Sequence, residues 1–173
     1  PSRNDIIVFK LPAQNAERTF GKAAAGEITI KRIVALPGDT VIVSNGILKV
    51  NGNMVNLLAQ RAGLLVSGNS GIPSLSVFPN DTTITKWTLT NFGPLVVPRK
   101  GYSFAFNSLT HLIYKDVVET EEPGRFNSRD DSFTLSRYVV KEDYLFVCGD
   151  NVSYSLDSRY WGFLPSKAVT SNL

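Results

Sequence analysis

The stretch GDNVSYSLDSRYWGFLP, residues 149–165, is the most informative part of this sequence. It directly follows the apolar run Tyr144–Cys148, which has the length of a buried strand. Polar residues that gather where a strand ends are typical of a functional site or of a surface turn. A surface turn with a local Asp157–Arg159 pair would not explain why Gly-Asp-Asn, Ser155 and Trp-Gly occur in the same segment. We therefore predict a functional site here.

A second feature is Lys31, inside the Ile- and Val-rich segment EITIKRIVAL, residues 27–36. A lysine on a half-exposed strand commonly extends its ammonium group to water while its carbon chain covers apolar surface. A buried lysine behaves differently. Burial disfavours the charged ammonium, so the amine can lose its proton and act as a general base. The spacing alone leaves both interpretations open.

The rest of the chain predicts a mainly β fold. Asn-Gly pairs at 45–46 and 51–52 separate short Val- and Ile-rich runs, which is a strong signal of β-hairpins. Strands are expected at residues 6–9, 27–36, 40–43, 47–50, 87–90, 95–97, 132–135 and 144–147. Residues 13–25 predict a loop or a short mobile segment.

One helix is expected in the second half of the chain. Asn107 or Ser108 can cap it, and Pro123-Gly124 would stop it. The residues at helical spacing are Leu109, Leu112, Ile113, Val117 and Val118.

The composition indicates a globular domain and excludes several kinds of site. With 43% hydrophobic residues, the chain has enough apolar side chains for a core. The net charge of +3 is spread along the chain without a basic stripe, so no nucleic-acid partner is predicted. The single cysteine, Cys148, is expected in the core, and with His111 as the single histidine it cannot build a zinc site. The sequence has no run of about 18 apolar residues, so these residues are not expected to cross a membrane.

Three motifs together resemble bacterial type I signal peptidases, a family of membrane-bound Ser/Lys proteases. Residues 149–165 are similar to the family's signature GDN-x3-S-x-DSR-x-WG-x2-P, and residues 31–39 (KRIVALPGD) to its lysine motif KR-x4-PGD. Residues 4–12 (NDIIVFKLP) resemble its GDIVVF-x2-P motif, with Asn4 in place of glycine. The resemblance implies an antiparallel-sheet catalytic core with an inserted second lobe that carries the expected helix. The long insertion is most similar to that of Bacteroides-like members.

The resemblance also implies roles for individual residues. Lys31 would be the general base of a Ser/Lys dyad, and Ser155 would hydrogen-bond its amine and orient it. Two salt bridges would support the site: Asp157 with Arg159, and Arg32 with Asp150. The signal peptide would lie as an added strand on an edge made of Ile28, Thr29 and Ile30. No metal or organic cofactor is implied.

The family's nucleophilic serine and membrane anchor are expected upstream of Pro1. In the family this serine stands in a Ser-Met-x-Pro stretch before the GDIVVF motif, and Ser2 is too close to the first strand to replace it. We therefore expect residues 1–173 to lack the nucleophile and to be inactive alone. The full protein is expected to remove signal peptides from exported proteins at the outer, periplasmic face of the cytoplasmic membrane.

The expected division is a catalytic core of residues 1–53 and 139–173 around an inserted lobe of residues 54–138. Two alternatives stay open: a related Ser/Lys enzyme, such as a pilin-processing peptidase or a self-cleaving repressor, and a non-catalytic β-rich binding domain. A Ser-His-Asp hydrolase is disfavoured. His111 lies in the expected helix, and residues 68–71 (GNSG) do not match the G-x-S-x-G nucleophile motif.

Overall fold

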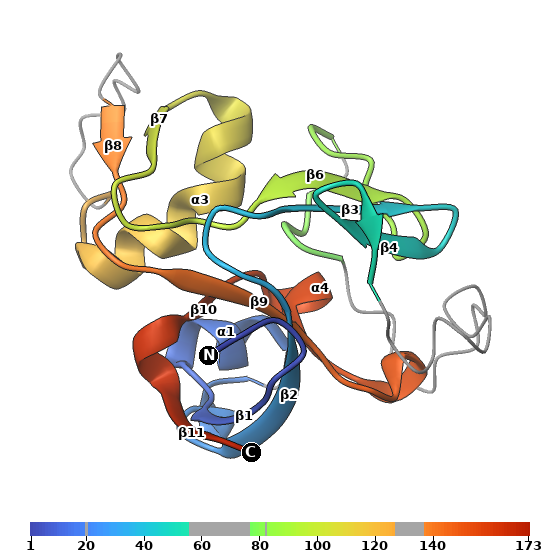
Figure 1. The fold of residues 1–173 in the computed structure, drawn as a ribbon. Coiled ribbons are helices and arrows are strands. Elements are labelled where there is room, and N and C mark those ends of the chain that lie inside the picture. The colour runs from blue at the N-terminus through green and yellow to red at the C-terminus, as the bar shows by residue number, and fades with distance from the viewer. Residues whose placement is uncertain (20, 56–76, 82, 127–136) are drawn as a thin grey trace.

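The structure is a computed structural model that describes residues 1–19, 21–55, 77–81, 83–126 and 137–173. The described residues form three antiparallel sheets and a few helices, so the predicted mainly β fold is confirmed (Figure 1). None of the helices among these residues is long and apolar enough to cross a bilayer.

The largest sheet brings together the segments that predict a site. Its five strands run in the order β10-β9-β2-β1-β11, and all neighbours are antiparallel. Their bounds are β1 Ile6–Lys10, β2 Ile28–Ala35, β9 Tyr144–Cys148, β10 Leu164–Pro165 and β11 Val169–Asn172. Because β2 pairs with both β1 and β9, all three motifs meet along β2.

A second sheet contains the predicted hairpins. Its order is β5-β4-β3-β6, with bounds β3 Thr40–Ser44, β4 Ile47–Val50, β5 Asn53–Met54 and β6 Phe92–Val96. Both residues of each Asn-Gly pair have positive φ, the conformation of the type I′ turns that close tight hairpins. The hairpin prediction is therefore confirmed.

Two other strand predictions have different outcomes. The strand expected at 87–90 is wrong, because the backbone groups of Thr88 and Asn91 bond each other and close a turn there. The strand expected at 132–135 lies outside the described residues. A third, two-stranded sheet consists of β7 Ser103–Ala105 and β8 Arg137–Val139.

The predicted helix is confirmed as α3 Ser108–Glu121. Asn107 is its N-cap and forms a capping box with Thr110. The loop expected at 13–25 is wrong, because this segment contains α1 Ala13–Thr19 and the 3₁₀ turn η1 Lys22–Ala24. The remaining short helical elements are η3 Val152–Tyr154, α4 Ser158–Trp161 and η4 Ser166–Ala168.

Two hydrophobic clusters meet at β2 and β9. Ile33 and Val147 face a smaller cluster with β1, α1 and α4, whereas Val34 and Phe146 face a larger one with α3 and the second sheet. All five residues of β9 are buried, because β9 runs between the two parts of the molecule (Figure 1). Residues 1–53, expected to belong to one core, contribute side chains to both clusters.

Candidate active site

Lys31 and Ser155 meet at Gly149, the first residue after β9. Arg32 pairs with Cys148 in an antiparallel register, so the preceding residue of β2, Lys31, lies level with Gly149. A Cβ atom built on Gly149 would lie 2.2 Å from Ser155 Oγ and 3.8 Å from Lys31 Cδ. Both side chains therefore lie on the side of Gly149 where any other residue would carry its Cβ atom. A larger residue at this position would collide with Ser155.

The Ser155 hydroxyl is buried and has no hydrogen-bond partner in the part of the chain that the structure describes. Ser155 is 7% exposed, and its Oγ makes no hydrogen bond to any described residue. The resemblance implies a hydrogen bond to the Lys31 amine; the structure brings the two side chains together without that bond. A buried hydroxyl without a partner costs about 1–3 kcal/mol. Such a cost is typical of functional sites, where a polar group is kept ready for a partner.

A buried ion pair holds the loop that carries Ser155. Arg159 Nε lies 2.8 Å from Asp157 Oδ1, and Arg159 Nη2 lies 2.9 Å from Asp157 Oδ2. Asp157 also accepts from two backbone N–H groups: that of Gly149, 3.1 Å from Oδ2, and that of Arg159, 3.2 Å from Oδ1. Arg159 Nη2 lies 2.8 Å from the Val152 carbonyl oxygen and 3.5 Å from that of Ser155. The pair therefore ties the start of the loop to its end.

Asp157 favours the charged form of Arg159 in spite of burial. Burial alone would lower the pKa of the Arg159 guanidinium, but the adjacent Asp157 carboxylate outweighs it and raises the pKa above its usual value. Asp157 is fully buried and Arg159 is 5% exposed. Removal of either partner would leave a buried charge uncompensated.

A second ion pair joins the three motifs. Arg32 Nε and Nη2 donate to the two carboxylate oxygens of Asp150, both at 2.7 Å, and Arg32 Nη1 donates to the Asn4 carbonyl at 2.7 Å. This bidentate hydrogen bond from Arg32 lowers the pKa of Asp150. The pair is partly exposed, so it orients the chain more than it stabilises it.

The first half of β2 has an open edge among the described residues. Residues 28–31 pair with β1, but the pairing with β9 starts at Arg32. The bonds from Leu11 N to Glu27 O and from Ile33 N to Asp5 O show that the odd-numbered residues of β2 face β1. The backbone groups of Ile28 and Ile30 therefore point to the open edge.

The structure also shows the positions of Cys148 and His111, which the sequence analysis discussed. Cys148 is fully buried, as predicted, and burial raises the pKa of its thiol well above the usual value. His111 lies on α3 with its ring against Phe126. In the described part of the chain, no group of three or more His, Cys, Asp or Glu residues could hold a metal ion.

Sequence reasoning missed Asn15, which it placed in a loop. This side chain is 2% exposed and bonds the backbone on both sides of Gly162, next to the predicted site. A short polar segment such as AQNAERT carries no signal of this contact, because the partners are carbonyl groups almost 150 residues away.

Several known proteins are similar to this chain. Signal peptidase I of Buchnera aphidicola (subsp. Baizongia pistaciae) is 28% identical over 186 residues, which cover 96% of this chain and 52% of that protein. Signal peptidase I of Haemophilus influenzae is 28% identical, with 98% of this chain and 48% of that protein covered. The chain thus spans about half the length of these relatives.

A crystal structure of a signal peptidase I from Enterococcus faecalis V583 aligns over the whole chain and 96% of its own length, with 25% identity and a TM-score of 0.46. The model of the family described as "Signal peptidase, peptidase S26" matches residues 1–173 of this chain. This protein chain therefore belongs to the S26 family of signal peptidases.

Proposed function

We propose that this chain is a large part of the catalytic domain of a serine endopeptidase that removes signal peptides from exported proteins. The observation that carries the proposal is the meeting of Lys31 and the unpaired Ser155 hydroxyl at Gly149. Membership of the S26 family supports the reaction class. Lys31 is the general base, and Ser155 orients its amine.

The nucleophilic serine is proposed to come from a segment outside residues 1–173, because the relatives are about twice as long as this chain. Lys31 Nζ accepts the hydroxyl proton of that serine while the serine oxygen attacks the scissile carbonyl carbon. The resulting ammonium gives the proton to the leaving amine as the peptide C–N bond breaks. A water molecule then hydrolyses the acyl-enzyme by the same route, with Lys31 again as base.

The substrate is proposed to bind as a strand on the open edge of β2. On that edge no described strand pairs with the backbone N–H and C=O groups of Ile28 and Ile30, so an extended peptide could pair with them. Ile30 is 55% exposed and stands next to Lys31, so its side chain would help to wall a pocket near the scissile bond. A small apolar pocket of this kind accepts alanine-sized side chains.

We also propose that the full protein is anchored in the cytoplasmic membrane by residues outside this chain. The catalytic domain would then lie on the outer face, where signal peptides of exported proteins emerge.

The test uses the full-length protein and a signal-peptide substrate with small residues before the cleavage site. We expect cleavage at that site by mass spectrometry, and none when a bulky residue replaces the small one. Lys31→Ala should abolish cleavage, whereas Lys10→Ala, on the neighbouring strand, should not. If the full-length protein binds the peptide without cleaving it, the proposal is wrong and the domain is a binding module. Cleavage by residues 1–173 alone would place the nucleophile inside this chain.

A further inference from the structure

The helix α4 is too short to hold its own position. It has four residues, and isolated helices of this length are not stable in water. Its position therefore depends on the packing of Tyr160 and Trp161 in the smaller cluster and on the groups that bond its two ends. At the N-terminal end, Asp157 is the N-cap, and it belongs to the buried ion pair that contacts the Ser155 loop.

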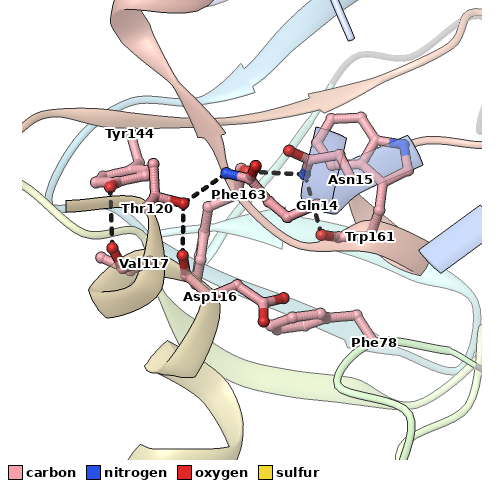
Figure 2. Close-up of a pocket in the computed structure, with 9 residues that line it drawn as sticks. All are labelled: Gln14, Asn15, Phe78, Asp116, Val117, Thr120, Tyr144, Trp161 and Phe163. Atoms are coloured by element: carbon pink, nitrogen blue, oxygen red, sulfur yellow. Dashed lines mark hydrogen bonds between the residues drawn. The ribbon is translucent and has the colours of Figure 1, made fainter. Parts of the chain in front are cut away.

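The C-terminal end of α4 is held by Asn15 from α1. The two N–H bonds of Asn15 Nδ2 point to the Trp161 carbonyl at 3.2 Å and to the Phe163 carbonyl at 3.1 Å (Figure 2). These carbonyls flank Gly162, whose φ of +84° turns the chain from α4 into β10. Asn15 thus supplies donors to carbonyls that the helix itself cannot satisfy.

We infer that Asn15 is a positioning residue for the site, acting through α4; this rests on the proposed function. One helical turn, about 6 Å, separates the carbonyls that Asn15 binds from the Asp157–Arg159 pair. That pair in turn bonds the Gly149 N–H and lies against the carbonyl of Ser155. A shift of the C-terminal end of α4 therefore moves Ser155 relative to Lys31.

The neighbour of Asn15 on α1 provides a matched control. Gln14 Nε2 donates to Thr120 on α3, away from α4 (Figure 2). Both residues lie on the same helix and line the same small cavity of about 10 Å³. Loss of the Gln14 bond loosens α1 from α3 but removes no donor from the turn after α4.

A second contact limits how far α4 can move. Phe78 N–H donates to the Arg159 carbonyl at 2.9 Å, and the Phe78 ring packs against Gly162. Loss of Asn15 should therefore displace α4 without unfolding it, and the result should be an altered site in a folded protein.

The experiment compares Asn15→Leu with Gln14→Leu in the full-length protein. For Asn15→Leu we expect kcat per folded molecule to fall by up to about 100-fold, the size of effect that a displacement near 1 Å produces. KM should stay unchanged, because the proposed peptide edge at residues 28–30 is not touched. Gln14→Leu should keep kcat close to that of the wild type. If Asn15→Leu does not fold, Asn15→Ser, which adds no volume, takes its place.

A readout without catalysis separates this inference from the proposed function. Two amide protons report on the two ends of the proposed connection between Asn15 and the site. The Gly162 N–H donates to Ser158 O, and the Gly149 N–H donates to Asp157 Oδ2. Both should exchange with solvent faster in Asn15→Leu and not in Gln14→Leu. If Gly162 changes and Gly149 does not, or if kcat stays at the wild-type level, the inference is wrong. A wild-type protein without peptidase activity would overturn the proposed function, and the exchange rates would still decide the role of Asn15.

Discussion

The sharpest prediction concerns Gly149→Ala. The added methyl carbon would lie 2.2 Å from Ser155 Oγ and 2.6 Å from Ser155 Cβ, whereas ordinary contacts begin at 3.4 Å. The serine side chain must therefore retreat by about 1 Å, which for an overpacked buried site costs about 1–3 kcal/mol of unfolding free energy. In a domain of this size that lowers the melting temperature by about 2–4 °C for each kcal/mol.

The same displacement should lower turnover much more than stability. A catalytic group that is misplaced by about 1 Å can cost about 100-fold in rate. The assay measures turnover of the full-length protein and the melting temperature of the same samples. The double variant Gly149→Ala/Ser155→Gly removes both close contacts, so it should recover stability but not turnover. Wild-type turnover in Gly149→Ala, or no recovery of stability in the double variant, would refute the packing of Ser155 against Gly149.

Four further predictions follow from the geometry. Lys31→Arg should abolish turnover with little change in melting temperature, because arginine cannot deprotonate at working pH; near-normal turnover would exclude Lys31 as the base. Ser155→Ala should slow turnover more than it lowers the melting temperature, and equal turnover would remove Ser155 from the site. Asp157→Ala and Arg159→Ala should each destabilise by about 3–5 kcal/mol in chemical denaturation, and additive effects in the double variant would show that the two charges are not coupled. Glu121→Gln should lower the melting temperature, because its carboxylate accepts bonds from two tyrosine hydroxyls and two backbone N–H groups, and an amide cannot accept all four.

Local signals predicted the parts of the fold that local physics decides. The two Asn-Gly pairs predict hairpins because asparagine and glycine tolerate positive φ, and the structure has that conformation at all four residues. Asn107 predicts the start of α3 because its side chain can accept a hydrogen bond from the first turn. These signals need no knowledge of distant residues.

The sequence was less informative about the structure of two other segments, α1 and residues 87–90. α1 has no apolar stripe of helical length, and it forms because Ala16 and Asn15 are buried against the rest of the fold. The segment 87–90 has the β-branched composition of a strand, but the bonds between Thr88 and Asn91 close it into a turn. In α1 tertiary contacts decide the structure, whereas at residues 88–91 local hydrogen bonds between residues three apart override the strand preference.

The candidate site lies between these two cases. The motifs identify its residues, but only the pairing of β2 with β9 places Lys31 beside Gly149. The arrangement is unfavourable for a domain that needs only to fold, because it includes a fully buried carboxylate and a buried hydroxyl that no other described residue bonds. Apolar residues of similar volume would often stabilise such positions as well or better. The concentration of these costs within one loop, directly beside a lysine, therefore supports the proposal that Lys31 serves chemistry and not only the stability of the fold.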